Sequence, residues 1–297
     1  MKKILVIGSA NIDFTTYVSG FPQKGQTVKG NNFESNIGGK GLNQSFSAYY
    51  LGGDVTFIGS LGNDEQGNTI RDFCKKEGIN AILKNSNVHT GIATIVVDEE
   101  KKDNIIIVVG GSNNDLKKED IDLSLLKNSD IILMQMEIPI ETIDYVLEKA
   151  KELNKITILN PAPATILTDK MLKGLDYIIP NETELNVIAI GNTLEEKCDN
   201  LLKKGVKNII VTLGDKGSIL INQKEKLVIS PHKVKVVDTT AAGDSYIGTF
   251  VYELSKGTEI KNALNNASFI SAKTVTRKGA IKSLEKSSSF KNNIIQK

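Results

Sequence analysis

The segment Asp238-Thr239-Thr240-Ala241-Ala242-Gly243-Asp244 combines small residues with a carboxylate, directly before a helical pattern at about 245–255. Small residues at a helix start allow successive backbone N–H groups to approach an anion, and the helix dipole favours negative charge there. A carboxylate beside a phosphate would repel it, unless the carboxylate accepts the proton of an attacking hydroxyl during phosphoryl transfer. Asp244 is therefore a candidate general base. The alternative interpretation is that it only caps the helix.

Polar residues also follow other strand-like segments. Asn11 and Asp13 are two residues apart, so in a strand both side chains lie on one face, where they could hold vicinal hydroxyls. The loop Gly38-Gly39-Lys40-Gly41-Leu42-Asn43 opens a helix, and its glycines permit close backbone approach to a ligand. Glu137 follows the apolar run 131–134. Taken singly, each has an ordinary structural alternative as a turn cap, a solvated lysine or a helix start.

Two further loops complete this set. Asn181 and Glu184 are one helical turn apart and could organise a water-coordinated magnesium ion, or simply begin a helix. Thr212-Leu213-Gly214-Asp215-Lys216-Gly217 has the form of a turn that faces a nucleotide, although an ordinary hairpin is the alternative. Ligands of open α/β sheets collect beyond the carboxyl ends of the strands, so loops at these positions are where a site is expected.

Several enzyme classes are excluded by the motifs that are missing. The sequence contains no G-x-x-x-x-G-K-[ST] motif and no protein-kinase signature. The segment Gly8-Ser9-Ala10-Asn11 does not continue as a dinucleotide-binding fingerprint, which disfavours a nicotinamide-dependent dehydrogenase. The two histidines share no ligand-like spacing with the two cysteines, so a zinc site is not expected.

Composition narrows the remaining possibilities. The 297 residues carry a net charge of +2, from 37 basic and 35 acidic residues whose signs are interspersed along the sequence. This pattern does not indicate the positively charged surface that binds nucleic acid. No apolar stretch approaches the length of about 20 residues that a membrane span needs, and the short apolar run at 4–7 fits a buried strand better than a signal peptide. Cys74 and Cys198 lie far apart, which suggests the reducing cytoplasm.

Strand-like and helical segments alternate along the chain, which predicts an α/β fold with a mostly parallel central sheet flanked by helices. The expected strands are nearly continuous in Val, Ile and Leu, as when both sheet faces are covered. We expect strands at 3–7, 55–58, 131–134, 156–159, 177–179, 209–212 and 218–221, and helices at 42–50, 66–77, 141–154, 182–190, 194–203 and 245–255.

Two regions break this alternation and read as inserted hairpins, at about 12–36 and 88–110. The first is expected to turn at Phe21-Pro22-Gln23-Lys24-Gly25. Together they predict a small β-sheet within a single domain spanning 1–297, either as a lid over an active site or as peripheral hairpins that cap the core. The exposed edge strands of a lid are also able to pair with another subunit.

Taken together, these segments resemble the ribokinase family of carbohydrate kinases, also called the phosphofructokinase-B family. The resemblance covers nearly the whole chain, and its most specific motifs are 238–244 and Gly38-Gly39-Lys40-Gly41-Leu42-Asn43-Gln44. Asn160-Pro161-Ala162-Pro163-Ala164 and Met134-Gln135-Met136-Glu137 point to the ribokinase branch. The resemblance implies the Rossmann-like ribokinase fold and ATP-dependent phosphorylation of the 5-hydroxyl of D-ribose. Deoxyribose, another sugar or a nucleoside is the alternative acceptor, and a non-catalytic sugar- or nucleotide-binding protein is the alternative of another class.

Site roles follow from the same resemblance, position by position. It implies Asp244 as general base and an anion hole from Ala241, Ala242 and Gly243, with the other groups assigned as follows. The sugar would be bound by Asn11, Asp13, Gly39, Lys40, Asn43, Glu137 and Asp244; the nucleotide by Asn181, Thr212, Gly214, Gly217, Gly243 and Ser268; K⁺ by Asp238, Thr240, Thr274, Gly279 and Ser283; and Mg²⁺, through water, by Glu184.

The resemblance also implies a homodimer through the lid strands. The charge pattern and the short apolar runs predict no nucleic-acid or membrane partner. Three positions depart from the family's pattern. Ile281-Lys282-Ser283 stands where Gln-Pro-Ser is usual, Ser268 replaces an asparagine or histidine, and Leu42 replaces an alanine beside the sugar loop. We expect Leu42 to reshape the sugar pocket.

Overall fold

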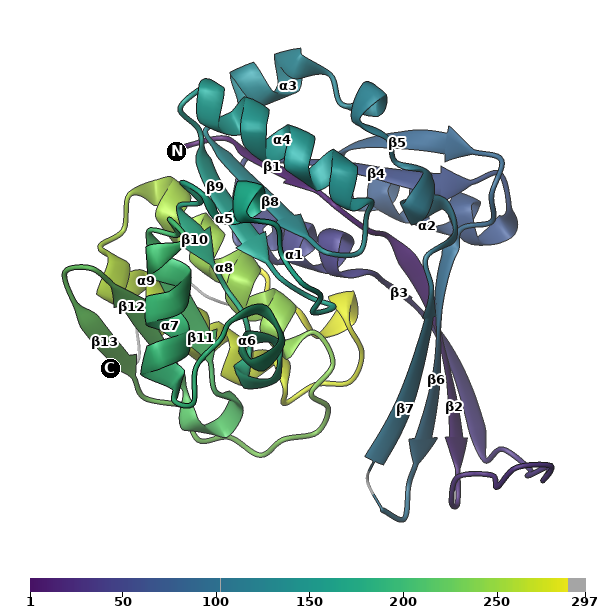
Figure 1. Cartoon of the computed structure of the whole chain (residues 1–297). Helices are drawn as coiled ribbons and strands as arrows, with labels where there is room; N and C mark the ends of the chain where they lie inside the picture. The colour runs from purple at the N-terminus through teal and green to yellow at the C-terminus, as the bar shows by residue number, and fades with distance from the viewer. Residues whose placement is uncertain (102, 288–297) are drawn as a thin grey trace.

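A nine-stranded sheet forms the centre of the protein in the computed structural model, which describes residues 1–101 and 103–287 (Figure 1). The strand order is β13-β12-β11-β10-β9-β8-β1-β4-β5. Every neighbouring pair from β11 to β5 is parallel, and only β12 and β13 join in antiparallel fashion. The predicted mostly parallel sheet is therefore confirmed.

The elements have the following bounds. The strands of the main sheet are β1 Ile4–Ile7, β4 Val55–Gly62, β5 Asn80–Ser86, β8 Ile131–Gln135, β9 Ile156–Asn160, β10 Tyr177–Ile178, β11 Asn208–Thr212, β12 Ser218–Asn222 and β13 Lys226–Ile229. The helices are α1 Lys40–Tyr50, α2 Glu65–Glu77, α3 Leu123–Asn128, α4 Ile140–Glu152, α5 Asp169–Leu172, α6 Glu182–Ile188, α7 Leu194–Lys203, α8 Ala242–Lys256 and α9 Ile260–Thr274. Short 3₁₀ helices lie at Gly111–Asp115, Lys118–Asp120, Gly214–Lys216 and Ile281–Ser283.

Helices cover both faces of this sheet, and each face has its own hydrophobic core. Successive residues of β1 alternate between the two cores: Leu5 and Ile7 belong to one and Ile4 and Val6 to the other. The first core is closed by side chains of α4, α5, α6 and α7, and the second by side chains of α1, α2, α8 and α9. Burial on both faces explains why the strands are so uniformly rich in Val, Ile and Leu.

The two inserted segments form a separate four-stranded sheet that projects from the edge of the main body (Figure 1). Its order is β3-β2-β6-β7, with bounds β2 Asn11–Val18, β3 Asn32–Gly38, β6 Gly91–Asp98 and β7 Asp103–Val109. The outer pairs are antiparallel and the central pair, β2 with β6, is parallel. Two hairpins therefore meet side by side, as the sequence predicts.

Five elements and the length of one turn differ from the sequence-based expectation. Strands β5 and β13 and helices α3, α5 and α9 were not predicted. The connection between β2 and β3 runs from 19 to 31, and is longer than the predicted turn at 21–25. Within the described residues, no helix has the length and apolarity to cross a membrane.

Candidate active site

A cavity of about 240 Å³ lies beyond the carboxyl ends of β9, β10 and β11, between the amino ends of α1, α6 and α8. This is the edge at which ligands of open α/β sheets bind. The cavity gathers residues from four of the predicted site loops. Its lining consists of Lys40, Asn160, Ala162, Ile179, Asn181, Glu184, Thr212, Thr239, Ala241, Ala242, Gly243, Asp244 and Ile247.

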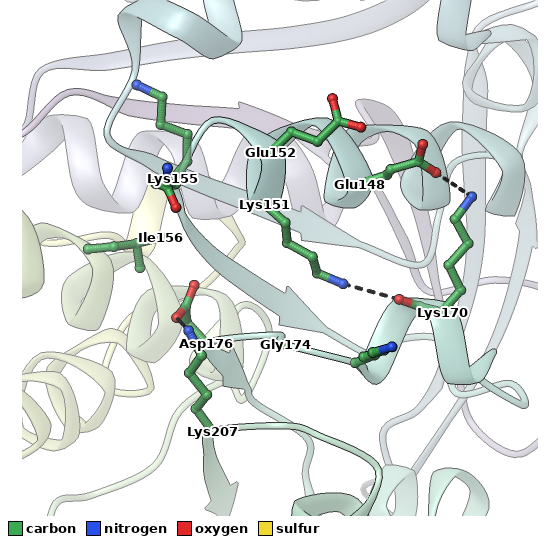
Figure 2. A pocket seen from close by; sticks show the side chains of 11 residues that line it. Glu148, Lys151, Glu152, Lys155, Ile156, Lys170, Gly174, Asp176 and Lys207 are labelled. Carbon is green, nitrogen blue, oxygen red and sulfur yellow. Dashed lines mark hydrogen bonds and ion pairs between the residues drawn. The ribbon is translucent and has the colours of Figure 1, made fainter.

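A larger hollow of about 650 Å³ lies near the opposite ends of the strands (Figure 2). It is rich in lysine, but several of these lysines already have partners. Lys170 pairs with Glu148 at 2.6 Å, Lys207 pairs with Asp176 at 2.7 Å, and Lys151 donates to the carbonyl of Lys170 at 3.1 Å. We therefore place the candidate active site in the smaller cavity, where the polar groups converge.

Asp244 lies in the first turn of α8 and is 8% exposed. Ala241 directly precedes the helix in the left-handed conformation, with φ 59°. The N–H groups of a first helical turn have no partner within the helix. That of Ala242 donates to the Thr239 carbonyl at 3.2 Å, so those of Gly243 and Asp244 are available at this end. A backbone anion site and a carboxylate thus share one helix end.

Two carboxamides hold the Asp244 carboxylate. Asn43 Nδ2 donates to Oδ2 at 2.9 Å, and Gln44 Nε2 donates to Oδ1 at 2.9 Å. Both donors are buried and adjacent on α1, so Asp244 connects the start of α1 to the start of α8. The second polar atom of Asn43, its Oδ1, is buried and has no hydrogen-bond partner among the described residues. A buried free acceptor of this kind fits a ligand hydroxyl.

Charged groups crowd around Lys40. Burial, followed by the charges of Glu137 and Asp244, raises the pKa of Asp13 to about 7, although Lys40 acts in the opposite direction. Burial alone would lower the pKa of Lys40, but Asp244, Glu137 and other carboxylates raise it above its usual value. One ammonium group is therefore the shared counter-ion of several carboxylates, which suits a site that binds a polyhydroxylated molecule beside a phosphate.

The remaining predicted sugar-binding residues lie at the start of β2 and around α1. Asn11 Oδ1 accepts a hydrogen bond from Asn113 Nδ2 at 2.7 Å. Glu137 Oε2 accepts from the Ser9 hydroxyl and from the backbone N–H of Lys40 at 3.2 Å. Gly39, with φ 92°, precedes α1 at a point where a Cβ would meet the backbone of Ala10 at 2.8 Å. The base of the small sheet and the start of α1 thus form one polar surface.

Asn181 and Glu184 form a reciprocal helix cap. Glu184 accepts from the Asn181 backbone N–H and from its Nδ2, both at 2.9 Å, and Asn181 Oδ1 accepts from the Glu184 N–H at 2.8 Å. The structural alternative from the sequence is therefore confirmed, yet both residues also line the cavity. Burial raises the pKa of Glu184.

The predicted nucleotide residues divide into two groups. Thr212, Asn181 and Gly243 line the cavity. Gly214 and Gly217 lie outside its lining, at the ends of a 3₁₀ turn that continues from Thr212, and Ser268 lies on α9 with its hydroxyl directed to the Ser230 carbonyl at 3.3 Å. The cavity therefore accounts for only part of the predicted nucleotide site.

Two of the predicted cation residues, Thr240 and Gly279, contact a third, Asp238. Its Oδ1 accepts from Thr240 N at 2.9 Å and its Oδ2 from Gly279 N at 2.8 Å. These hydrogen bonds outweigh burial and lower the pKa of Asp238. Thr274 ends α9, and Ser283 is buried with its hydroxyl directed to the Ala280 carbonyl at 2.7 Å. Carbonyl, hydroxyl and carboxylate oxygens of this kind fit a hard cation.

Leu42 lies outside the lining of the cavity, and its expected effect on the sugar pocket stays a prediction. It is fully buried in the second hydrophobic core beside Phe46. Its side chain points to the core because α1 turns about 100° per residue, which separates Leu42 from the face that carries Lys40 and Asn43.

Sequence reasoning assigned no role to Gln44, Gln135, Asn160 or Asn113, although these amides hold other site residues. Three of them, namely Gln44, Gln135 and Asn160, lie within motifs that carried the family resemblance. A polar residue in an otherwise apolar strand end or helix face was the signal that could have found them.

The raised pKa of Asp13 predicts a pH-dependent stability of the ligand-free protein. Between pH 4 and 7 the unfolded chain has released the proton that native Asp13 keeps, so the free energy of unfolding falls as pH rises and levels off above about 7. We expect Asp13→Asn to remove this slope and to be about 1–2 kcal/mol more stable than wild type at pH 8. Urea unfolding between pH 4 and 8 measures this, with exposed Asp72→Asn as the charge control. Parallel profiles for wild type and Asp13→Asn would rule out the assignment.

The arrangement defines an α/β enzyme that handles phosphate at a helix start beside a carboxylate. Residues 1–287 match the model of the pfkB family carbohydrate kinases, and the chain belongs to this family. It is 39% identical to a ribokinase of Dictyostelium discoideum, over 96% of this chain and 98% of the relative. It is 33% identical to a deoxyribokinase of Salmonella typhimurium, over 93% of both chains. It also resembles the structure of Arabidopsis thaliana ribokinase complexed with ribose and ATP, with 29% identity, a TM-score of 0.88 and 98% of each chain covered.

Proposed function

We propose that this protein is an ATP-dependent sugar kinase that transfers the γ-phosphoryl group to the 5-hydroxyl of D-ribose, giving ribose 5-phosphate and ADP. The observation that carries the proposal is the buried Asp244 at the start of α8, held by Asn43 and Gln44 beside free backbone N–H groups. A protein that only binds sugar or nucleotide has no need of a carboxylate next to a phosphate site.

Ribose would bind between the base of the small sheet and α1. Asn11, Asp13 and Glu137 supply acceptors for its hydroxyls, Asn43 offers its unpaired Oδ1, and Gly39 and Lys40 close the loop around the sugar. Asp13 is better able to accept two hydroxyls once it is ionised. Bound sugar places its 5-hydroxyl against Asp244, which takes the proton as the oxygen attacks the γ-phosphorus.

The phosphoryl group would be stabilised by the backbone N–H groups of the Ala241–Gly243 segment, where negative charge develops during transfer. The nucleotide would extend toward Asn181, Thr212, Gly214 and Gly217, with Ser268 near the base.

Magnesium would enter this site bound to ATP rather than coordinated by protein side chains. Among residues 1–101 and 103–287, no cluster of three or more His, Cys, Asp or Glu side chains could hold a metal. Glu184, whose oxygens already accept from Asn181, would contact a water of the ion's hydration shell. Bound Mg²⁺ would neutralise phosphate charge.

Potassium would be held by Asp238 and by oxygens of Thr240, Thr274, Gly279 and Ser283. Asp238 already ties the loop that leads into the anion-binding segment to Gly279. A cation at this point would fix that loop without contacting the substrate. Ile281 and Lys282 are accommodated, since Ile281 is buried and Lys282 donates to Asn36 Oδ1 of β3 at 3.0 Å.

The direct test is ADP release from MgATP with D-ribose, compared with deoxyribose, fructose and nucleosides, each with and without K⁺. We expect turnover on ribose that rises with K⁺. Deoxyribose remains the alternative acceptor because a deoxyribokinase is among the relatives. Preferred turnover on another acceptor would replace ribose in the proposal and keep the kinase, whereas absence of turnover on every acceptor would contradict the proposed activity.

We also propose that the small sheet is a lid that excludes water from the transfer and joins two copies of the chain. Strand β7 is an edge strand, and both of its faces are apolar and exposed over Ile105, Ile106, Ile107, Val108 and Val109. An exposed apolar edge strand of this kind promotes association with another chain. In a symmetric dimer, the same strand of a second copy would cover it. The reaction would take place in the cytoplasm, since the two cysteines are free and buried.

Replacing Ile107 by lysine is expected to convert the dimer to a monomer, because a charge in an apolar interface must be desolvated. Light scattering coupled to gel filtration measures the mass. Val228→Lys is the matched control, since Val228 is exposed on β13, the edge strand of the main sheet. A wild-type monomer, or a dimer that survives Ile107→Lys, would refute this interface.

A further inference from the structure

A series of buried carboxamides, one of which lines the cavity, leads to Asp244. Gln135, which ends β8, donates through Nε2 to Gln44 Oε1 at 2.7 Å. Gln44 Nε2 donates both to Asp244 Oδ1 at 2.9 Å and to Asn160 Oδ1 at 3.1 Å. Asn160, which ends β9, donates through Nδ2 to the Ile179 carbonyl at 2.9 Å. The series therefore links two strand ends, one helix and the candidate base.

The direction of every amide in this series follows from one backbone atom. The Ile179 carbonyl can only accept, so Asn160 must turn its Nδ2 toward it and its Oδ1 toward Gln44. Gln44 must then present Nε2 to Asn160 and Oε1 to Gln135, whose Nε2 donates. The amide of Gln44 is thereby held from both sides with an N–H aimed at Asp244.

The carboxamide farthest from Asp244, that of Gln135, has an unpaired polar atom. Gln135 is fully buried, and its Oε1 has no hydrogen-bond partner among the described residues. An apolar side chain would avoid this unpaired acceptor, so stability alone gives no reason for glutamine here. Its useful atom is Nε2, which fixes the orientation of Gln44.

We infer that Gln44 is a positioning residue, oriented by Gln135 and Asn160, which holds the Asp244 carboxylate in the rotamer that faces the acceptor hydroxyl. The inference rests on the proposed phosphoryl transfer. Asn43 holds Oδ2 and keeps an unpaired Oδ1 that a ligand hydroxyl can engage, whereas Gln44 holds Oδ1 with an amide that Gln135 and Asn160 already fix. A displacement of about 1 Å at the reacting group lowers the rate by about a hundredfold, so this restraint acts on turnover and leaves sugar binding intact.

The experiment compares wild type, Gln44→Leu and Gln135→Met for kcat and KM with ribose, together with ribose affinity by calorimetry and thermal unfolding. We expect Gln44→Leu to lower kcat about tenfold to a hundredfold, with KM and ribose affinity within about twofold of wild type. Gln135→Met should lower kcat by a smaller factor, because it removes only the restraint on Gln44. If Gln44→Leu does not fold, the kcat of Gln135→Met tests the inference.

A double-variant cycle separates positioning from a general structural role. In the Asp244→Asn background, Gln44→Leu should cause no further loss of kcat, because it acts through Asp244. Ser45→Ala is the matched control, since it removes a buried hydrogen bond on α1, to the Gly41 carbonyl, with no contact to Asp244. Suppose that wild type turns over ribose. If both glutamine variants then keep the wild-type kcat, or if the double variant has a lower kcat than Asp244→Asn, the inference is overturned and the proposed function stands. No wild-type turnover on any acceptor would overturn the proposed function, and this inference with it.

Discussion

Asp244→Asn is expected to lower kcat with ribose by about a hundredfold or more, while ribose affinity stays close to that of wild type. Loss of a general base removes about two to four orders of magnitude, because the attacking hydroxyl must release its proton without a positioned acceptor. The asparagine has nearly the same shape, so the packing of α8 is retained. Asn43 and Gln44 would then face one acceptor oxygen and one amide nitrogen in place of two carboxylate oxygens.

Steady-state kinetics and calorimetric titration of ribose measure the two quantities separately. A loss in kcat and kcat/KM with unchanged affinity identifies an interaction used in the transition state. Thermal unfolding of both proteins controls for a structural defect. Equal turnover in the variant would leave Asp244 with only its structural contacts to Asn43 and Gln44 and would remove the proposed base from the mechanism.

Gly41→Ala is expected to have the second largest effect, because α1 packs directly against the chain that follows β1. A Cβ at Gly41 would lie 2.6 Å from the carbonyl carbon of Gly8 and from the N atom of Ser9, where no flexible side chain can yield. The helix start must therefore move. Overpacking of this kind costs about 1–3 kcal/mol of stability, and the shift displaces Asn43 and Gln44 from Asp244. We expect kcat/KM to fall by more than tenfold.

Chemical denaturation and kinetics test this, with Gly243→Ala as the comparator for stability. A Cβ at Gly243 meets no atom within 4 Å and the residue is helical, so this variant should unfold at the wild-type midpoint or slightly above it. If Gly41→Ala were as stable and as active as wild type, close packing of α1 would not be what positions the two amides.

Much of the fold could be predicted from the sequence because both faces of the main sheet are covered. Burial on two sides makes β1 and β8 continuous apolar runs, and helices with mixed faces separate them. Helix α9 escaped prediction because its buried positions include the small or polar residues Ala263, Ala267 and Ser268, which give a weak apolar stripe. Strand β5 alternates exposed and half-buried residues at the sheet edge, so it lacks the continuous pattern.

The candidate site was predictable where its residues share a loop, and was missed where they meet only in three dimensions. The helix start at Asp244 and the turn before Asn43 each carry a local signature of small residues. The contacts of Gln44 with Gln135 and Asn160 join residues 91 and 116 positions apart. No spacing rule connects such residues, because the order of β8 and β9 in the sheet brings them together.

The measurement that tests the central claim most directly is the position of phosphate on the product. Wild type and Asp244→Asn would be incubated with MgATP, K⁺ and ribose, and the sugar analysed by phosphorus–proton correlation NMR. Phosphate coupled to the C5 protons, formed by wild type and nearly absent with Asp244→Asn, is the expected result. Phosphate on another carbon, or equal formation of ribose 5-phosphate by both proteins, would contradict transfer to a 5-hydroxyl deprotonated by Asp244.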